Sequence, residues 1–378
     1  MKQINNVLCV FTRILGGKTF SKVLENHINA QGYSKVTYLD YDTEIFKKYR
    51  PPFYFKLGDA LQSAWPINKK YKATISDTSE YDAVFFQAYQ LTLPFSGLIK
   101  KKYVVLSLDS TPMNAVRHNL KARSVLSYSR FNRFCTHVLN ILLYKRIFKH
   151  IDVFLARTEL VEKSLINDYG ISKSKILVTY LPVESAQGYM SRKSSPRLNL
   201  LFAGNDWKLK GGQFLLDVFN DACAEVAHLT IVSTDQSVKS LPKRRGITVI
   251  NGLPNAELMS TMAQSDVFLF PSWKDELGLV LCEAVAQGIA VFARESGAQG
   301  ELVHDGVNGR LFEFASTVDE WREAILNLAM DENRLEMYKK NSLKLATQKL
   351  APSRFSEQLR HAFPIPALNA NPSQSQSD

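Results

Sequence analysis

Cysteine is scarce in this sequence and follows no recognisable pattern. The chain of 378 residues has four cysteines, with neither a CxxC pair nor a His-rich neighbourhood around any of them. This arrangement argues against the common zinc motifs and against a disulfide framework. It favours a protein that works in a reducing compartment.

Long hydrophobic runs are also missing. The N-terminal sequence MKQINNVLCVFTRILGG has only a short apolar run, which Thr12 and Arg13 interrupt, and this is too short for a secretory signal peptide. No stretch approaches the roughly 20 apolar residues that span a bilayer. We therefore expect a cytoplasmic protein, with peripheral attachment to the inner face of the membrane as an alternative.

Acidic residues are absent from one long segment, between Ser110 and Ile151, although the whole chain has a formal net charge of +11. Three interpretations remain open: a solvated basic helix face, contact with an anionic acceptor or membrane surface, and nucleic-acid binding. No known nucleic-acid module accompanies the charge, so we expect no nucleic-acid partner. The basic residues alternate with aromatic ones: Arg117, Lys121, Arg123, Arg130, Arg133, Lys145, Arg146 and Lys149 with Tyr128, Phe131, Phe134, Tyr144 and Phe148.

Strand-like and helix-like segments alternate along the whole chain, which predicts an α/β fold with parallel sheets. The length favours two domains, because single cores seldom grow beyond about 250 residues. We expect an N-terminal Rossmann-like domain over 1–184, a linker over 185–197, a second such domain over 198–347, a C-terminal helix within 348–366 that returns to the first domain, and a disordered tail over 367–378. Two sheets that face each other place the active site in the cleft between them.

Two glycines, Gly16 and Gly17, follow the first predicted strand, Val7–Thr12, and precede a helical pattern. A glycine-containing strand-to-helix turn is a good anion site, because the backbone can approach a phosphate and the helix N-terminus is partly positive. A plain turn that needs positive φ explains the pair almost as well. The GxGxxG pattern is absent, which disfavours a nicotinamide cofactor.

The strongest local signal lies between residues 267 and 309. A buried strand ends at Phe270, a charged loop contains Asp275, and Gly278 precedes a helix that carries Glu283. A glycine-led helix N-terminus offers free N–H groups to a phosphate, and ionised carboxylates accept paired hydrogen bonds from sugar hydroxyls. The sequence therefore predicts a ligand that carries both a diphosphate and sugars.

This block resembles the signature of retaining glycosyltransferases of the GT-B fold, family 4, which reads roughly PS..EGFGLV.LEA.A.G.PV and then GG..E.V.DG.NG. The earlier FAGNDWKLKGG is similar to the phosphate loop FxGR...KG of the same family. The resemblance extends over nearly the whole chain in order and is dense only after Leu198. Its counterparts here are Pro271, Ser272, Gly278, Leu279, Val280, Glu283, Ala284, Gly288, Gly297, Glu301 and 305–309, with Gly204, Lys210 and Gly211 in the phosphate loop.

The chain departs from the family pattern at four positions. The first glutamate of the paired motif is Asp275, and Glu276 stands at the usual glycine; we favour Asp275 as the carboxylate that acts. Where the family often has a histidine, this chain has Asp109, which either bonds the transferred sugar or caps a turn. The arginine of FxGR is replaced by Asn205, so Lys208 is expected to share the phosphate charge.

The resemblance implies a retaining hexosyltransferase that needs no metal or other cofactor. Its donor would be a UDP- or GDP-sugar held by Gly16, Gly17, Gly204, Lys208, Lys210, Gly278, Leu279 and Glu283, with Asp275, Glu276 and Asp109 as candidate catalytic residues. The acceptor would be a glycan, a lipid-linked sugar or another envelope component. The alternatives are a GT-B epimerase of sugar nucleotides and a degenerate, non-catalytic binding protein. The DxD at 40–42 is not expected to bind a metal.

Overall fold

The computed structural model describes residues 4–13, 17–41, 71, 75, 77–121, 141–186 and 197–363. Several predictions from the sequence lie outside these residues: Gly16, the second aspartate of the DxD, the centre of the basic segment, most of the 185–197 linker, and the tail over 367–378. Within the described ranges, no helix combines the length and the apolar character needed to cross a bilayer.

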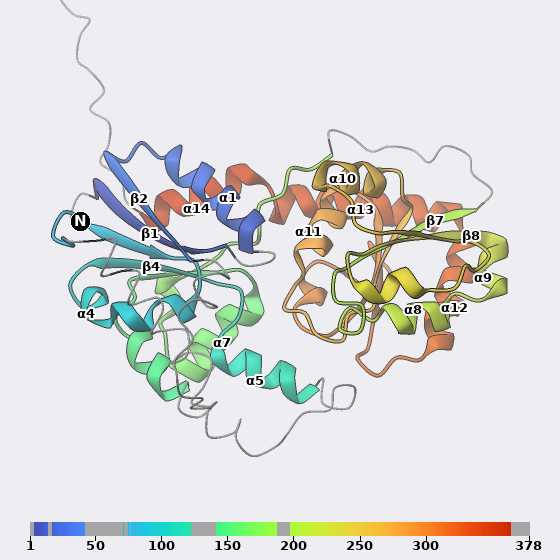
Figure 1. Ribbon diagram of the computed structural model, residues 1–378, viewed down its shortest axis with the longest axis horizontal. Helices are drawn as coiled ribbons and strands as arrows, with labels where there is room; N and C mark the ends of the chain where they lie inside the picture. Colours follow the sequence, from blue (N-terminus) through green and yellow to red (C-terminus); the bar gives the residue numbers. More distant parts are fainter. Residues whose placement is uncertain are drawn as a thin grey trace, which may run out of the picture.

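The first domain is built on a six-stranded parallel sheet in the order β2-β1-β3-β4-β5-β6. The chain therefore turns to opposite sides of β1 as it builds the sheet, first to β2 and then to β3 (Figure 1). The elements are β1 (Asn6–Thr12), α1 (Gly17–Asn29), β2 (Lys35–Tyr41), β3 (Ala83–Phe86), α4 (Ser96–Ile99), β4 (Tyr103–Leu108), α5 (Pro112–Lys121), β5 (Val153–Ala156), α7 (Glu159–Tyr169) and β6 (Ile176–Val178).

The second domain repeats this plan in the order β12-β11-β10-β7-β8-β9, again with parallel pairing throughout. Its elements are β7 (Leu198–Ala203), α8 (Gly212–Val218), α9 (Asp221–Val226), β8 (Ala227–Val232), β9 (Ile247–Ile250), α10 (Asn255–Ala263), β10 (Val267–Phe270), α11 (Leu279–Ala286), β11 (Ala290–Arg294), β12 (Gly309–Phe312), α12 (Val318–Ala329) and α13 (Glu332–Lys349).

The α/β class with two parallel sheets is confirmed. The strands β3 and β10 read AVFF and VFLF and are buried at every position, as expected for strands covered on both faces by helices. The end of the second domain consists of two successive helices. α12 stops at Met330, and Asp331 starts α13 by accepting a hydrogen bond from the backbone N–H of Arg334.

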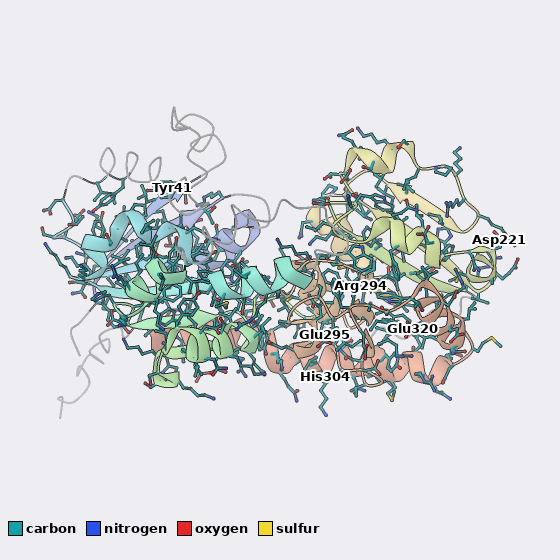
Figure 2. All side chains as sticks on the ribbon, turned by 90° about the horizontal axis from the view of Figure 1, so that it is seen from below. Tyr41, Asp221, Arg294, Glu295, His304 and Glu320 are labelled. Carbon is teal, nitrogen blue, oxygen red and sulfur yellow. The ribbon has the colours of Figure 1, made fainter. Side chains whose placement is uncertain are left out.

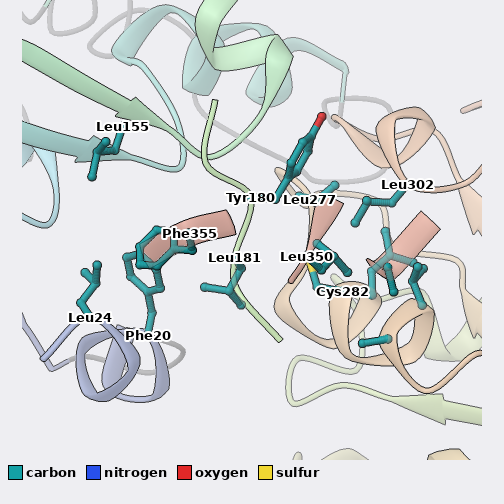
Figure 3. Packing of buried hydrophobic residues seen from close by; sticks show 14 of the residues in the cluster. Phe20, Leu24, Leu155, Tyr180, Leu181, Leu277, Cys282, Leu302, Leu350 and Phe355 are labelled. Atoms are coloured by element: carbon teal, nitrogen blue, oxygen red, sulfur yellow. The ribbon is translucent and has the colours of Figure 1, made fainter. Parts of the chain in front are cut away.

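The C-terminal helix α14 (Pro352–Ala362) leaves the second domain and packs against the first (Figure 1). The Tyr103 hydroxyl donates to the Ala362 carbonyl over 2.9 Å, and the Gln358 amide donates to the Val178 carbonyl over 2.7 Å. Figure 3 shows Phe355 of α14 beside Phe20 of α1, within one hydrophobic cluster that also includes residues of the second domain. The two domains therefore share a continuous apolar contact.

A polar contact also joins the domains, centred on Glu301. Its carboxylate accepts hydrogen bonds from the backbone N–H groups of Glu159 and Leu160, each over 2.8 Å, and from the Tyr180 hydroxyl over 2.9 Å. These two N–H groups belong to the first turn of α7, where Thr158 provides the usual cap. A carboxylate of the second domain thus completes a helix N-terminus of the first.

Candidate active site

The neighbouring strands β7 and β10 lie at the point where the second sheet changes direction. Ligands of open parallel sheets bind at the carboxyl ends of such strands, because the two following loops diverge there. Here the loops touch: the Trp273 N–H donates to the Leu209 carbonyl over 2.9 Å. Gly211 has φ +78°, and a Cβ on it would lie 2.2 Å from the Pro271 carbonyl oxygen. Only glycine permits this approach.

A lysine and a carboxylate meet between these two loops. Lys210 forms an ion pair with Asp275, whose carboxylate also lies 3.4 Å from the buried Ser272 hydroxyl. Gly204 makes room for the lysine, since a Cβ there would lie 2.9 Å from Lys210 Cγ. Lys208, in contrast, is exposed. The structure thus brings Gly204, Lys210 and Asp275 together and leaves Lys208 at the rim.

The helix α11 begins directly after the second loop. Gly278 precedes it with φ +91°, and a Cβ there would lie 2.7 Å from Phe270 Cζ. None of the side chains that the structure describes caps this helix, so its first amides, beginning at Leu279, are directed at the site. An anion can take the place of the missing cap.

Glu283 lies one turn into α11 and is 7% exposed. Burial raises the pKa of its carboxyl to about 7, although the Asn255 amide, 3.5 Å away, partly opposes this effect. The buried carboxylate has few protein partners and retains its capacity to accept hydrogen bonds from ligand hydroxyls.

Glu276 contacts the first domain. Its Oε1 lies 2.9 Å from Nδ1 of His118, which is 5% exposed on α5. The loop is held from behind by the Ala298 N–H, which donates to the Glu276 carbonyl over 2.6 Å. A Cβ on Gly297 would lie 2.2 Å from the Asp275 carbonyl oxygen, so this position also requires glycine. The two adjacent carboxylates therefore have different partners: Asp275 faces Lys210, and Glu276 faces His118.

The remaining predicted residues lie in the first domain. Asp109 follows β4 and is exposed, and Gly17 is the first residue of α1. Asp40 of the DxD forms an ion pair with Arg13 over 2.8 Å. Among the described residues, no group of three or more His, Cys, Asp or Glu side chains is placed to hold a metal ion.

A buried arginine that the sequence did not reveal supports the second loop. Arg294, at the end of β11, is fully buried inside the second domain (Figure 2). Its guanidinium lies 3.8 Å from the centre of the Trp273 ring, and it donates to the carbonyls of Pro271 over 3.4 Å and Phe314 over 2.6 Å. Burial lowers the pKa of Arg294 to about 10. The sequence pattern of β11 does not predict this role of Arg294, because the groups that Arg294 contacts come from distant segments of the chain.

The second domain has recognisable relatives. Residues 197–331 match the family model described as glycosyl transferases group 1. The second domain is similar to that family over this segment. The matched segment contains every site element described above from Gly204 to Ala298.

The comparisons extend this result to the fold of the whole chain. An uncharacterized 41.2 kDa protein in the cps region of Klebsiella pneumoniae is 28% identical over 57% of this chain and 60% of its own length. The chain spans less than two thirds of the curated relatives it matches first. HepE of Anabaena, crystallised with UDP and glucose, is 15% identical, with coverage of 95% and 99% and a TM-score of 0.64.

WaaG, a glycosyltransferase involved in lipopolysaccharide biosynthesis, gives a TM-score of 0.63 at 13% identity, with coverage of 93% of this chain and 99% of WaaG. At these identities the likeness concerns the fold. The chain has the GT-B fold, with two Rossmann-like domains.

Proposed function

We propose that this chain transfers a sugar, with retention of configuration and without a metal, from a nucleotide-sugar donor to a glycan, a lipid-linked sugar or another cell-envelope acceptor. The observation that carries the proposal is the arrangement of Lys210, Asp275, the uncapped start of α11 and Glu283 around the switch point of the second sheet. These groups match the parts of a nucleotide sugar: a diphosphate, a ribose and a hexose.

In this proposal the diphosphate lies at the first amides of α11 and beside Lys210. The bond between the anomeric carbon and the diphosphate breaks, and its electron pair goes to a diphosphate oxygen. The acceptor hydroxyl oxygen bonds to the anomeric carbon on the same face, and its proton passes to the departing diphosphate. Lys210 and the amides stabilise that charge, which in a water-poor site contributes several kcal/mol. Glu283 accepts hydrogen bonds from the ribose hydroxyls. Asp275 holds a hydroxyl of the transferred sugar and offsets positive charge on its ring.

The donor is proposed to be a UDP- or GDP-sugar. HepE, which shares the fold, is crystallised with UDP and glucose, and this favours UDP as the first nucleotide to test. A thermal-shift screen of UDP-, GDP- and ADP-sugars identifies the donor, because a ligand that binds only the folded state raises Tm. The proposal predicts a shift with one nucleotide class, and Lys210→Gln should abolish it. The exposed Lys239→Gln is the matched control, which should leave the shift unchanged.

Transfer itself is tested with the donor found in this screen. Product formed only when an acceptor is added, with the anomeric configuration of the donor by NMR and with full activity in excess EDTA, supports the proposal. Conversion of the donor without any acceptor identifies an epimerase instead. Donor binding without transfer or hydrolysis identifies a non-catalytic protein.

Contact with an anionic membrane through residues 110–151 is a separate proposal. In the described part of this segment, Tyr144 and Phe148 are buried in the first domain and are unavailable to lipid. Lys145 and Arg146 are exposed on the same helical stretch, together with Leu142, which is 57% exposed. Co-sedimentation with vesicles rich in phosphatidylglycerol, and none with pure phosphatidylcholine, is the expected result. Equal behaviour with both vesicles contradicts it.

A further inference from the structure

Arg157 lies at the carboxyl edge of the first sheet, directly after β5 (Val153–Ala156). Its backbone N–H continues the ladder to β4 by donating to the Leu108 carbonyl over 2.9 Å. The next residue, Thr158, caps α7, whose first amides are bound by Glu301. Contacts from both domains therefore fix the backbone at this position.

The side chain of Arg157 lies against Phe20, which belongs to the hydrophobic cluster shared by both domains. Its guanidinium lies 3.4 Å from the centre of the Phe20 ring on α1, three residues after Gly17. Burial lowers the pKa of Arg157, while the nearby Asp109 carboxylate acts to raise it. Figure 3 shows Phe20 and Cys282 on opposite sides of the segment that carries Leu181. Arg157 thus lies beside the first turn of α1.

The guanidinium is incompletely satisfied in this position. Its Nε is buried and has no hydrogen-bond partner among the residues that the structure describes. Arg157 as a whole is half-buried, but a buried donor atom without a partner is costly, and such atoms are usually paired. The planar fork of arginine matches the oxygens of a phosphate better than any other side chain.

The second domain lacks a cation that the family pattern would supply. Asn205 stands where FxGR has arginine, Lys210 shares its charge with Asp275, and Lys208 is exposed. The start of α1, which lies beside Arg157, is one of the two helix starts expected to hold the diphosphate of the donor. The missing positive charge can therefore come from the first domain.

We infer that Arg157 binds the diphosphate of the nucleotide-sugar donor and supplies the positive charge that Asn205 cannot. This inference rests on the proposed function. Because Arg157 belongs to the first domain, it also couples donor binding to the contact between the domains.

The experiment compares uridine, UMP and UDP by calorimetry, or the corresponding guanosine series if the screen selects GDP. Arg157→Met should weaken diphosphate binding at least tenfold and change nucleoside binding less than twofold. Arg157→Lys should give an intermediate loss, because it keeps the charge without the fork. The control is Arg117→Gln, which removes an exposed arginine paired with Asp168; it should leave all three affinities unchanged.

The outcomes separate this inference from the proposed function. Unchanged UDP affinity in Arg157→Met, or an equal loss for uridine, UMP and UDP, overturns the inference and leaves Arg157 as a stacking partner of Phe20. A wild-type chain that binds no nucleoside diphosphate refutes the proposed function itself. If Arg157→Met does not fold, the UDP-to-UMP affinity ratio of Arg157→Lys decides, since a purely structural role leaves that ratio unchanged.

Discussion

Replacement of Glu283 by Gln should stabilise the protein while weakening donor binding. Burial raises the pKa of this carboxyl from 4.5 to about 7, and at about 1.4 kcal/mol for each pKa unit its ionisation costs the folded state about 3 kcal/mol. Glutamine has nearly the same shape and keeps an oxygen for the Asn255 amide. It removes the buried charge without leaving a cavity.

The stability difference between Glu283→Gln and the wild type depends on pH, and its direction follows from the raised pKa. Between pH 4.5 and 7 the folded state binds a proton at Glu283 that the unfolded state has lost, so stability falls as the pH rises through this window. Above pH 7 ionised Glu283 destabilises the folded wild type by the full amount, and below pH 4.5 this destabilisation is absent. The variant should therefore be about 3 kcal/mol more stable than the wild type at pH 8.5 and equally stable at pH 4.5. For a domain of this size, this raises Tm by about 6–12 °C.

The assay is urea and thermal unfolding of both proteins at the two pH values, without ligand. The exposed Glu257→Gln on α10 is the control and should show no difference at either pH. Donor affinity should fall at least tenfold in Glu283→Gln at pH 8.5, since hydrogen bonds to an ionised group contribute about 1.5–3 kcal/mol. Equal or lower stability at pH 8.5 would refute the desolvation argument. Unchanged donor affinity would refute the ribose assignment.

Three further predictions concern the loop after β10. Asp275→Asn should lower kcat at least about a hundredfold, as expected when a group that contacts the transition state is lost. Glu276→Gln should lower kcat less than tenfold. If Glu276→Gln has the larger effect, the catalytic role belongs to Glu276. Gly278→Ala should cost about 1–3 kcal/mol in urea unfolding, because its φ is +91° and a Cβ would lie 2.7 Å from Phe270 Cζ; unchanged stability contradicts this. Arg294→Lys should lower the free energy of unfolding by about 2–4 kcal/mol, since lysine cannot both stack and donate to two carbonyls, and wild-type stability would show that the fork is dispensable.

The fold could be predicted from the sequence because its strands are buried on both faces. Such strands read as short apolar runs, as in YVVLSL of β4, VFLA of β5 and VFLF of β10. Gly278 was predictable for a similar reason, since a glycine between a strand and a helix has few other uses.

The interdomain part of the site could not be predicted in this way. His118 and Arg157 become part of it only when two separately folded sheets are placed together, and no local pattern records that placement. His118 lies in the basic segment between Ser110 and Ile151, where the charge suggested an anionic partner and no pattern pointed to this histidine. The choice between Asp275 and Glu276 depends on the orientation of their loop. Contacts from Gly297 and Ala298, more than twenty residues later in the chain, determine that orientation.

The Glu301 contact has a mechanical consequence. Two amides in the first turn of α7 donate to a carboxylate from the other domain, so pulling the domains straight apart breaks two hydrogen bonds to a charged group, worth about 1.5–3 kcal/mol each. Rotation about that contact avoids this cost. A motion that separates His118 from Glu276 and keeps these hydrogen bonds must therefore rotate about the Glu301 contact.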